Sequence, residues 1–113
     1  MHEYSIASAM MQRIEQEAEA HQATRVKSVR VRIGELAGLE VELFRTAYDI
    51  VSRDTVCDGA PLEVAVVPVQ WACPQCHAPA PAGGRLVCAS CGVPLRLVSG
   101  DEIMLDRIEL EVA

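Results

Sequence analysis

The sequence predicts an α+β fold in which two helices pack on a small β-sheet and a zinc-ribbon-like module is inserted into the chain. Two segments space their apolar residues as a helix does, and three segments alternate apolar with polar residues as half-buried strands do. Before the last alternating segment lies a stretch crowded with proline, glycine and cysteine, which has little to bury. With 113 residues, the chain forms one domain, or one small domain with a metal-held appendage.

The first helix is expected over residues 5–22. Its apolar stripe recurs at every fourth position and is widened on one side, through Ile6, Met10, Ile14 and Ala18 with Ala7 and Met11 beside them. Ser5 is the expected N-cap, because its hydroxyl can accept a hydrogen bond from a backbone N–H of the first turn.

The remaining elements follow from the same periodicities. Residues 26–36 read as a strand, since Val29, Val31 and Ile33 alternate with Arg30 and Arg32. We expect these two arginines to lie on a solvated face with carboxylates nearby. Helical spacing returns over residues 39–53, through Leu43, Phe44, Ala47, Ile50 and Val51. Further strands are expected at residues 62–66 and 103–112.

The last strand fixes the domain organisation. A lone strand leaves its backbone N–H and C=O groups unmatched, so residues 103–112 must pair with the earlier strands. The cysteine-rich stretch is then an insertion. We expect an α/β body made of residues 1–69 plus 103–113, and an inserted metal-binding module at residues 70–102.

Two Cys-x-x-Cys pairs, Cys73 with Cys76 and Cys88 with Cys91, predict a metal site. Two such turns facing each other form a tetrahedral cage of four sulfurs, the geometry of closed structural zinc sites. Iron in the same cage is the main alternative. Disulfides are a third possibility, but they need an oxidising compartment, and nothing in the sequence suggests export.

Two further side chains have metal-binding chemistry without a matching pattern. Cys57 has no second cysteine three positions away, so we interpret it as an ordinary thiol. His77 follows Cys76 directly and is expected to be exposed, where it could compete with a cysteine for the metal.

The N-terminus has the composition of a chelating site. The α-amine of Met1, the His2 backbone nitrogen and the His2 imidazole can close adjacent five- and six-membered rings around one ion. Nitrogen donors of this kind favour a square-planar ion such as Ni(II) or Cu(II). The Glu3 amide or a receiving protein is a candidate for the open fourth position. The alternative is a frayed end without a role.

The charge of the chain excludes some classes of partner. The formal net charge is −6, and no basic stripe is present, so binding to nucleic acid is not expected. No signal-peptide pattern and no apolar run of membrane-spanning length occurs, so we expect a cytoplasmic protein without membrane insertion.

Several motifs in a fixed order resemble the HypA/HybF family, the nickel metallochaperones of NiFe-hydrogenase maturation. The resemblance covers nearly the whole chain and includes residues 1–5 (Met-His-Glu-Tyr-Ser), 33–36 (Ile-Gly-Glu-Leu), both cysteine pairs and residues 99–102 (Ser-Gly-Asp-Glu). No single motif is decisive, whereas their order and spacing are.

The resemblance implies a metal carrier and not an enzyme. It implies transported Ni(II) held at the terminus by His2, with Glu3 assisting, and structural Zn(II) on the two cysteine pairs. It also implies handover with the nickel-binding GTPase HypB to the hydrogenase large subunit. We expect a monomer or a weak homodimer.

Three other classes were weighed against this one. A zinc-ribbon nucleic-acid module would carry basic and aromatic residues around the cysteines, where only Arg85 and Arg96 occur near Trp71. An iron–sulfur electron carrier would hold one iron in the cage and would be red. A hydrolytic zinc enzyme is the weakest alternative, because four cysteines leave no open coordination position.

Overall fold

The computed structural model describes residues 2–80 and 83–113. Its elements in chain order are α1 (His2–Ala20), β1 (Ala23–Gly34), α2 (Val41–Ser52), β2 (Leu62–Val67), β3 (Gln70–Ala72), β4 (Arg96–Ser99) and β5 (Ile103–Val112). The α+β class expected from the sequence is confirmed.

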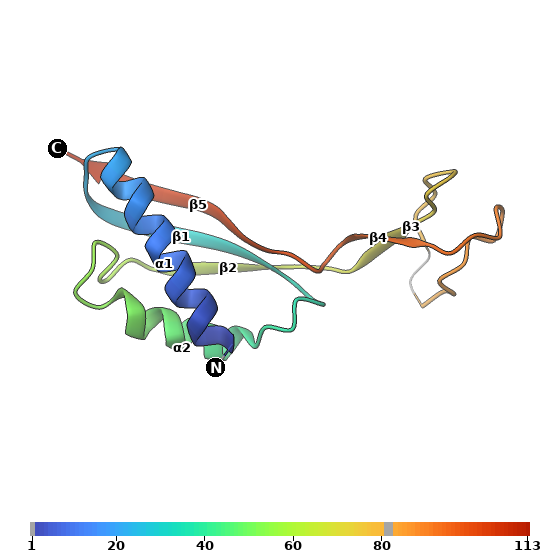
Figure 1. Cartoon of the computed structure of the whole chain (residues 1–113), viewed down its shortest axis with the longest axis horizontal. Coiled ribbons are helices and arrows are strands. Elements are labelled where there is room, and N and C mark those ends of the chain that lie inside the picture. The colour runs from blue at the N-terminus through green and yellow to red at the C-terminus, as the bar shows by residue number, and fades with distance from the viewer. Residues whose placement is uncertain (1, 81–82) are drawn as a thin grey trace.

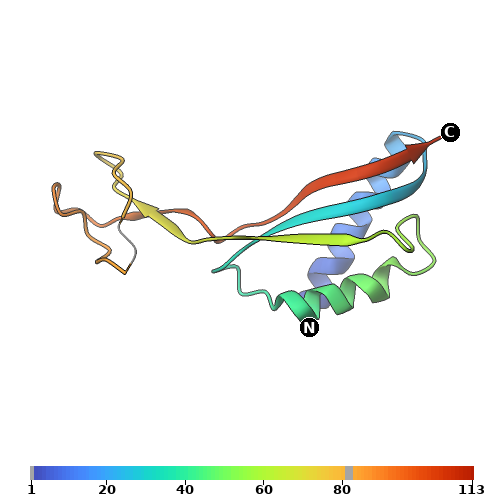
Figure 2. The same ribbon diagram turned by 180° about the vertical axis from the view of Figure 1, so that it is seen from behind.

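The body is a three-stranded mixed sheet with both helices on one face (Figures 1 and 2). The strand order is β2-β1-β5, with β2 parallel and β5 antiparallel to the central strand β1. Two parallel neighbours need a crossover connection, which α2 supplies between β1 and β2. The chain's last strand therefore pairs with its first, as expected from the need to match its backbone groups.

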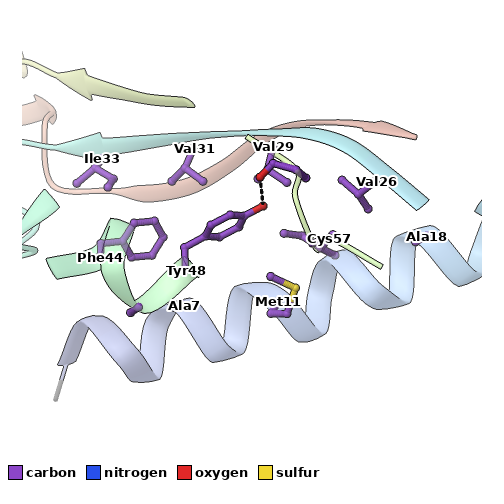
Figure 3. Close-up of a cluster of buried hydrophobic side chains, with 13 residues drawn as sticks. Ala7, Met11, Ala18, Val26, Val29, Val31, Ile33, Phe44, Tyr48 and Cys57 are labelled. Atoms are coloured by element: carbon purple, nitrogen blue, oxygen red, sulfur yellow. Dashed lines mark hydrogen bonds between the residues drawn. The ribbon is translucent and has the colours of Figure 1, made fainter. Parts of the chain in front are cut away.

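The apolar face of β1 makes the centre of the core. Val29, Val31 and Ile33 are almost completely buried and point toward the helices (Figure 3). Arg30 lies on the opposite face, with its Nε 3.3 Å from a carboxylate oxygen of Asp106 and 3.9 Å from one of Glu63. The alternation seen in the sequence therefore predicted both faces of this strand correctly.

Helix α1 begins earlier than expected. It starts at His2, so Ser5 lies within the helix and is not its N-cap, which corrects that prediction. The most buried residues of α1 are Ala7, Met11, Ile14 and Ala18, all within the expected stripe, while Ile6 and Met10 pack at its border.

Helix α2 buries only part of its expected apolar stripe. Phe44, Ala47 and Tyr48 are buried, whereas Leu43 and Ile50 are 57% and 47% exposed. Tyr48 is accepted in the core because its hydroxyl donates a 3.3 Å hydrogen bond to the carbonyl of Ala60, the dashed line in Figure 3. Burial raises the pKa of Tyr48 above its usual value, so the phenol stays protonated.

The second sheet is a hairpin of β3 and β4 (Figure 1), and the connection between these two strands carries the four cysteines. We call residues 70–99 the cysteine arm. It extends away from the helices, and the whole chain measures 57 × 28 × 17 Å. None of the helices in the described part of the chain has the length and apolar character needed to cross a bilayer.

Two glycines allow the chain segments to cross where the arm joins the body. A Cβ on Gly34 would lie 2.2 Å from the backbone carbon and oxygen of Gly100, far inside contact distance. Gly100 itself has a positive φ of 105° and lies against the backbone of Val69. Only residues without a side chain fit this crossing.

Hydrogen bonds from the end of β1 fasten the same crossing. The Glu35 carboxylate accepts the N–H of Val69 at 2.7 Å, and the Glu35 N–H donates to the carbonyl of Val67 at 3.0 Å. The next N–H, of Leu36, donates to the carbonyl of Gly100 at 2.6 Å. Both legs of the arm are thus held by one short segment of the body.

A methyl group at the crossing should destabilise the protein more than one in an open turn. We expect Gly34→Ala to cost about 3 kcal/mol in the free energy of unfolding, since backbone atoms must move. Gly59→Ala is the matched control, because Gly59 has a φ of 80° but nothing within 4 Å of its added Cβ. It should cost only about 1 kcal/mol. Urea unfolding followed by circular dichroism measures both, and equal costs would contradict the crossing.

Candidate metal centres

The four cysteines of the two Cys-x-x-Cys pairs come together at the end of the arm. Their sulfur atoms all lie within 4.8 Å of one another, and the sulfurs of Cys76 and Cys88 are 3.8 Å apart. A tetrahedral ion with metal–sulfur bonds of about 2.3 Å holds its sulfurs about 3.8 Å apart. All five cysteines of the chain are free, so the cluster is not a pair of disulfides. The arrangement has the size of a four-sulfur metal site.

The two turns that present these sulfurs are copies of each other. In the first, the His77 N–H donates to the Cys73 carbonyl and the Cys73 N–H donates to the Ala78 carbonyl. In the second, Gly92 and Val93 make the same two bonds with Cys88. Short-range backbone hydrogen bonds therefore shape each half of the site, with N···O distances between 2.9 and 3.1 Å.

Backbone N–H groups also point at two of the sulfurs. Those of Gln75 and Cys76 donate to the sulfur of Cys73, and that of Cys91 donates to the sulfur of Cys88, each at 3.4 Å. The Cys76 N–H is the largest cause that lowers the pKa of the Cys73 thiol, to about 6.

The pKa of Cys91 moves the opposite way, to about 12, because the neighbouring sulfurs of Cys73 and Cys76 disfavour its ionised form. Four sulfurs this close cannot all carry a negative charge unless a cation lies among them. The chemistry of the donor set therefore fits a divalent metal ion.

Cys57 and His77, the other two side chains with metal-binding chemistry, lie outside this cluster. Cys57 is buried in the core of the body, where burial raises the pKa of its thiol to about 11. It is an ordinary thiol, as expected. His77 is exposed, as expected, and is not part of the four-residue cluster.

His77 occupies a backbone conformation that glycine takes in the other turn. Its φ is 64°, and the equivalent Gly92 has a φ of 70°. Left-handed backbone costs a residue with a Cβ about 1 kcal/mol relative to glycine. The first turn is therefore the strained one of the pair.

The N-terminal site residues lie on the body, at the start of α1. His2 is the first residue of the helix and is exposed, and Glu3 is partly exposed. Met1, whose amine was the third expected donor, lies outside the described residues. The first four N–H groups of a helix have no partner in the helix, and that of Glu3 donates to its own carboxylate instead.

The Glu3 carboxylate bridges the two helices. Its Oε2 accepts the N–H of Glu40, the N-cap residue of α2, at 3.0 Å. That hydrogen bond is the main cause that holds the pKa of Glu3 below its usual value, followed by one from the Glu3 N–H. Sequence reasoning missed Glu40, because the two residues are far apart in the chain. The signal in the sequence is weak: glutamate is not one of the residue types preferred at an N-cap, and the structure shows that Glu40 makes no side-chain cap of its own.

Comparison with known proteins identifies the family. Residues 1–110 match the family described as "Hydrogenase/urease nickel incorporation, metallochaperone, hypA". The chain belongs to the HypA family. This HypA-family protein is therefore a nickel metallochaperone of hydrogenase maturation with a four-cysteine zinc-type site, and the family is not one of enzymes.

Individual relatives align with this chain along almost their full length. The chain is 39% identical over 112 residues to the hydrogenase maturation factor HypA of Nitrosospira multiformis, covering 97% of each chain. It is 36% identical over 113 residues to the protein of the same name from Alkalilimnicola ehrlichii, covering 98% of this chain and all of the relative. A role in hydrogenase maturation implies partners related to hydrogenase.

Solved structures show the same fold. The solution structure of the Ni metallochaperone HypA from Helicobacter pylori superposes with a TM-score of 0.76 at 27% identity, over 98% of both chains. A second structure, a solution structure of HypA protein, gives a TM-score of 0.82 at 27% identity over 100% of this chain and 98% of that one. Both the body and the arm are thus part of a known arrangement.

The strain at His77 predicts a stabilising substitution. His77→Gly should retain the arm's metal more strongly by about 1 kcal/mol, roughly fivefold in the equilibrium constant, whereas Gly92→Ala should weaken retention by a similar amount. Competition with a chelator measures both. Faster metal loss from His77→Gly than from the wild type would mean that the imidazole stabilises the site, contrary to this account.

The Glu3–Glu40 hydrogen bond predicts a pH dependence with a definite sign. A carboxyl with a lowered folded pKa contributes stability above its unfolded value of 4.5, and this contribution is lost as the pH falls through the folded pKa. In the metal-free protein, the Glu40 amide signal should therefore titrate below pH 4.5. Glu3→Gln should keep the bond but abolish this titration in nuclear magnetic resonance spectra. A Glu40 signal that titrates unchanged in Glu3→Gln would contradict the assignment.

Proposed function

We propose that the chain carries Ni(II) on residues 1–3 and holds a structural Zn(II) on Cys73, Cys76, Cys88 and Cys91. The observation that supports this most is the separation of two donor sets of different chemistry. One is a closed group of four sulfurs at the tip of the arm, and the other is a nitrogen-rich helix start on the body (Figure 1).

Zinc is the ion that suits the sulfur site. Zn(II) has no geometric preference from its d electrons and takes closed tetrahedral thiolate sites as structural centres. The thiolates also compensate for the small core of the arm, in which the largest buried side chains are Cys73 and Cys88. Iron accepts the same four ligands, and the red colour of an Fe(III)–thiolate protein distinguishes it from colourless zinc.

Nickel suits the terminal site for the opposite reason. The α-amine of Met1, the deprotonated amide of His2 and the His2 imidazole form two fused chelate rings in one plane, which a square-planar ion prefers. The positive end of the α1 dipole favours the deprotonated form of an amide at that position. The terminal site has no sulfur ligand, whereas the site on the arm has only sulfur ligands. The softness of the ligands therefore determines which ion each site prefers.

Glu3 assists this site through its position. Its carboxylate is tied to the Glu40 N–H on α2, so the turn that contains His2 is held against the body. The same carboxylate places negative charge beside the chelating nitrogens, which offsets the charge of a bound cation. We therefore propose that Glu3 positions the terminal site, whether or not a carboxylate oxygen joins the metal.

The proposed delivery route is to NiFe hydrogenase. We propose that the chain acts with the nickel-binding GTPase HypB and hands nickel to the hydrogenase large subunit. The family description names urease as well as hydrogenase, but the relatives' names specify hydrogenase, which favours that target. Reduced thiols are needed for the sulfur site, so the protein should act in the cytoplasm, as a monomer or a weak homodimer.

The division into two domains also remains a proposal. The body comprises residues 1–69 plus 103–113, and the module comprises residues 70–102. Its support is that the two sheets share no strand and that each has its own source of stability, an apolar core in the body and a metal in the module.

Three variants separate the two metal sites. His2→Ala removes the imidazole, and a Gly-Ser extension before Met1 keeps the imidazole but displaces the amine. Both should cut nickel affinity sharply, by at least about tenfold, while zinc content stays at one per chain. The double variant Cys73→Ser with Cys76→Ser should lose the zinc and keep the terminal nickel site.

Calorimetry with Ni(II), combined with a metal inventory, is the test. Nickel binding to the wild type should also weaken as the pH falls, because protons compete with the metal for its nitrogen ligands. If the extended protein binds nickel as tightly as the wild type, the terminal amine is not a ligand. If the double cysteine variant keeps its zinc, the four-sulfur assignment is wrong.

A further inference from the structure

The cysteine arm differs from the body in charge. Residues 70–99 contain two arginines, Arg85 and Arg96, and no aspartate or glutamate, so all 16 acidic residues of the chain lie elsewhere. The chain carries a net charge of −6 and the arm contributes +2, so the body carries −8. A divalent ion on four thiolates brings the arm to neutrality.

The arm also exposes apolar side chains in adjoining grooves. Leu86, Val87 and Val98 are each about half exposed, at 50%, 50% and 51%. Leu86, Val98 and Trp71 line one groove of about 660 Å³, and Val87 lines a second of about 540 Å³. The two grooves share a wall formed by Pro79 and Ala80. Arg85 lines the groove that contains Val87.

A small metal-held module has few places to bury its apolar residues, so single exposed ones need no explanation. Contiguous apolar grooves on a surface that lacks carboxylates are a different matter, because such surfaces mark contacts with other molecules. Charge then selects the partner. The Arg85 guanidinium lines the groove of Val87, and exposed Arg96 lies two residues before Val98 on the same strand. Such groups complement a segment in which carboxylates flank apolar side chains.

The distance between arm and body makes this selection possible. At physiological ionic strength, charges are screened over about 8 Å, whereas the chain is 57 Å long. An acidic segment is repelled by the body but meets little of that repulsion at the tip of the arm. A basic segment, in contrast, is attracted to the body and gains nothing from the arm.

We propose that the cysteine arm is a docking surface for a protein segment that carries apolar side chains flanked by carboxylates. The apolar side chains occupy the groove of Trp71, Leu86 and Val98, and the carboxylates pair with Arg85 and Arg96. The surface needs a metal to hold the arm together but does not depend on which ion is present. It is also independent of nickel binding at the terminus.

The probe is a short synthetic peptide in which aspartate alternates with leucine and phenylalanine. It is titrated into the isotope-labelled, zinc-loaded full chain up to about 1 mM, and the same peptide with lysine for aspartate is the comparison. We expect the acidic peptide to shift the Trp71 indole N–H signal and the amide signals of Leu86 and Val98. The lysine peptide should leave these signals unchanged.

Matched variants test the two components of the surface. Leu86→Asn and the double variant Arg85→Glu with Arg96→Glu should each weaken binding of the acidic peptide by about tenfold. Leu43→Asn is the control, since it makes the same change at a residue of α2 that is 57% exposed, and it should bind like the wild type. The zinc content of each variant is measured. If Leu86→Asn loses its metal, the result of the double variant Arg85→Glu with Arg96→Glu decides the test, because both arginines are exposed.

Three results would overturn the proposal. One is the absence of shifts in the arm at the highest concentration of acidic peptide. Another is an equal effect of the lysine peptide on the arm, and the third is loss of binding in Leu43→Asn as large as that in the arm variants. None of these would alter the nickel titrations, so this proposal and the metal assignments fail separately.

Discussion

The backbone crossing of Gly34 and Gly100 is the contact on which the arrangement of the molecule depends. The chain leaves the body after β2 and returns before β5, so both legs of the arm must pass the end of β1 side by side. A Cβ at Gly34 would lie 2.2 Å from the backbone of Gly100, and Glu35 holds the outgoing leg at Val69. The arm is therefore attached by two chain segments that pack and hydrogen-bond against the end of β1.

The proposed function requires this protein to hold one metal permanently and to release another. The four cysteines satisfy the first need with a closed cage, built by two turns whose backbone hydrogen bonds are the same. The second need is better met by the exposed start of α1, where the proposed ligand His2 can be replaced by a ligand from a receiving protein. The Glu3–Glu40 hydrogen bond restrains that terminus without burying it. Distance and ligand type thus keep the two proposed ions apart in one small chain.

Local patterns predicted much of this structure, and distant contacts account for what they missed. The alternation of Val29, Val31 and Ile33 predicted a buried strand face, and the cysteine spacing predicted the cluster, because both depend on a few neighbouring residues. The start of α1 was missed because the residue that binds Glu3 is on another helix. Leu43 belongs to the apolar stripe of α2 but is exposed, because periodicity identifies the stripe and does not determine how far each of its residues is buried. Likewise, nothing adjacent to Gly34 reveals that Gly100 will press against it.

X-ray absorption at the zinc and nickel edges of one nickel-loaded sample tests the separation of the two metal sites directly. We expect four sulfur neighbours at about 2.3 Å around zinc, and only nitrogen and oxygen neighbours around nickel. Sulfur in the nickel shell would mean that the cysteines take part in nickel binding. Such a result would contradict the assignment of two chemically separate sites.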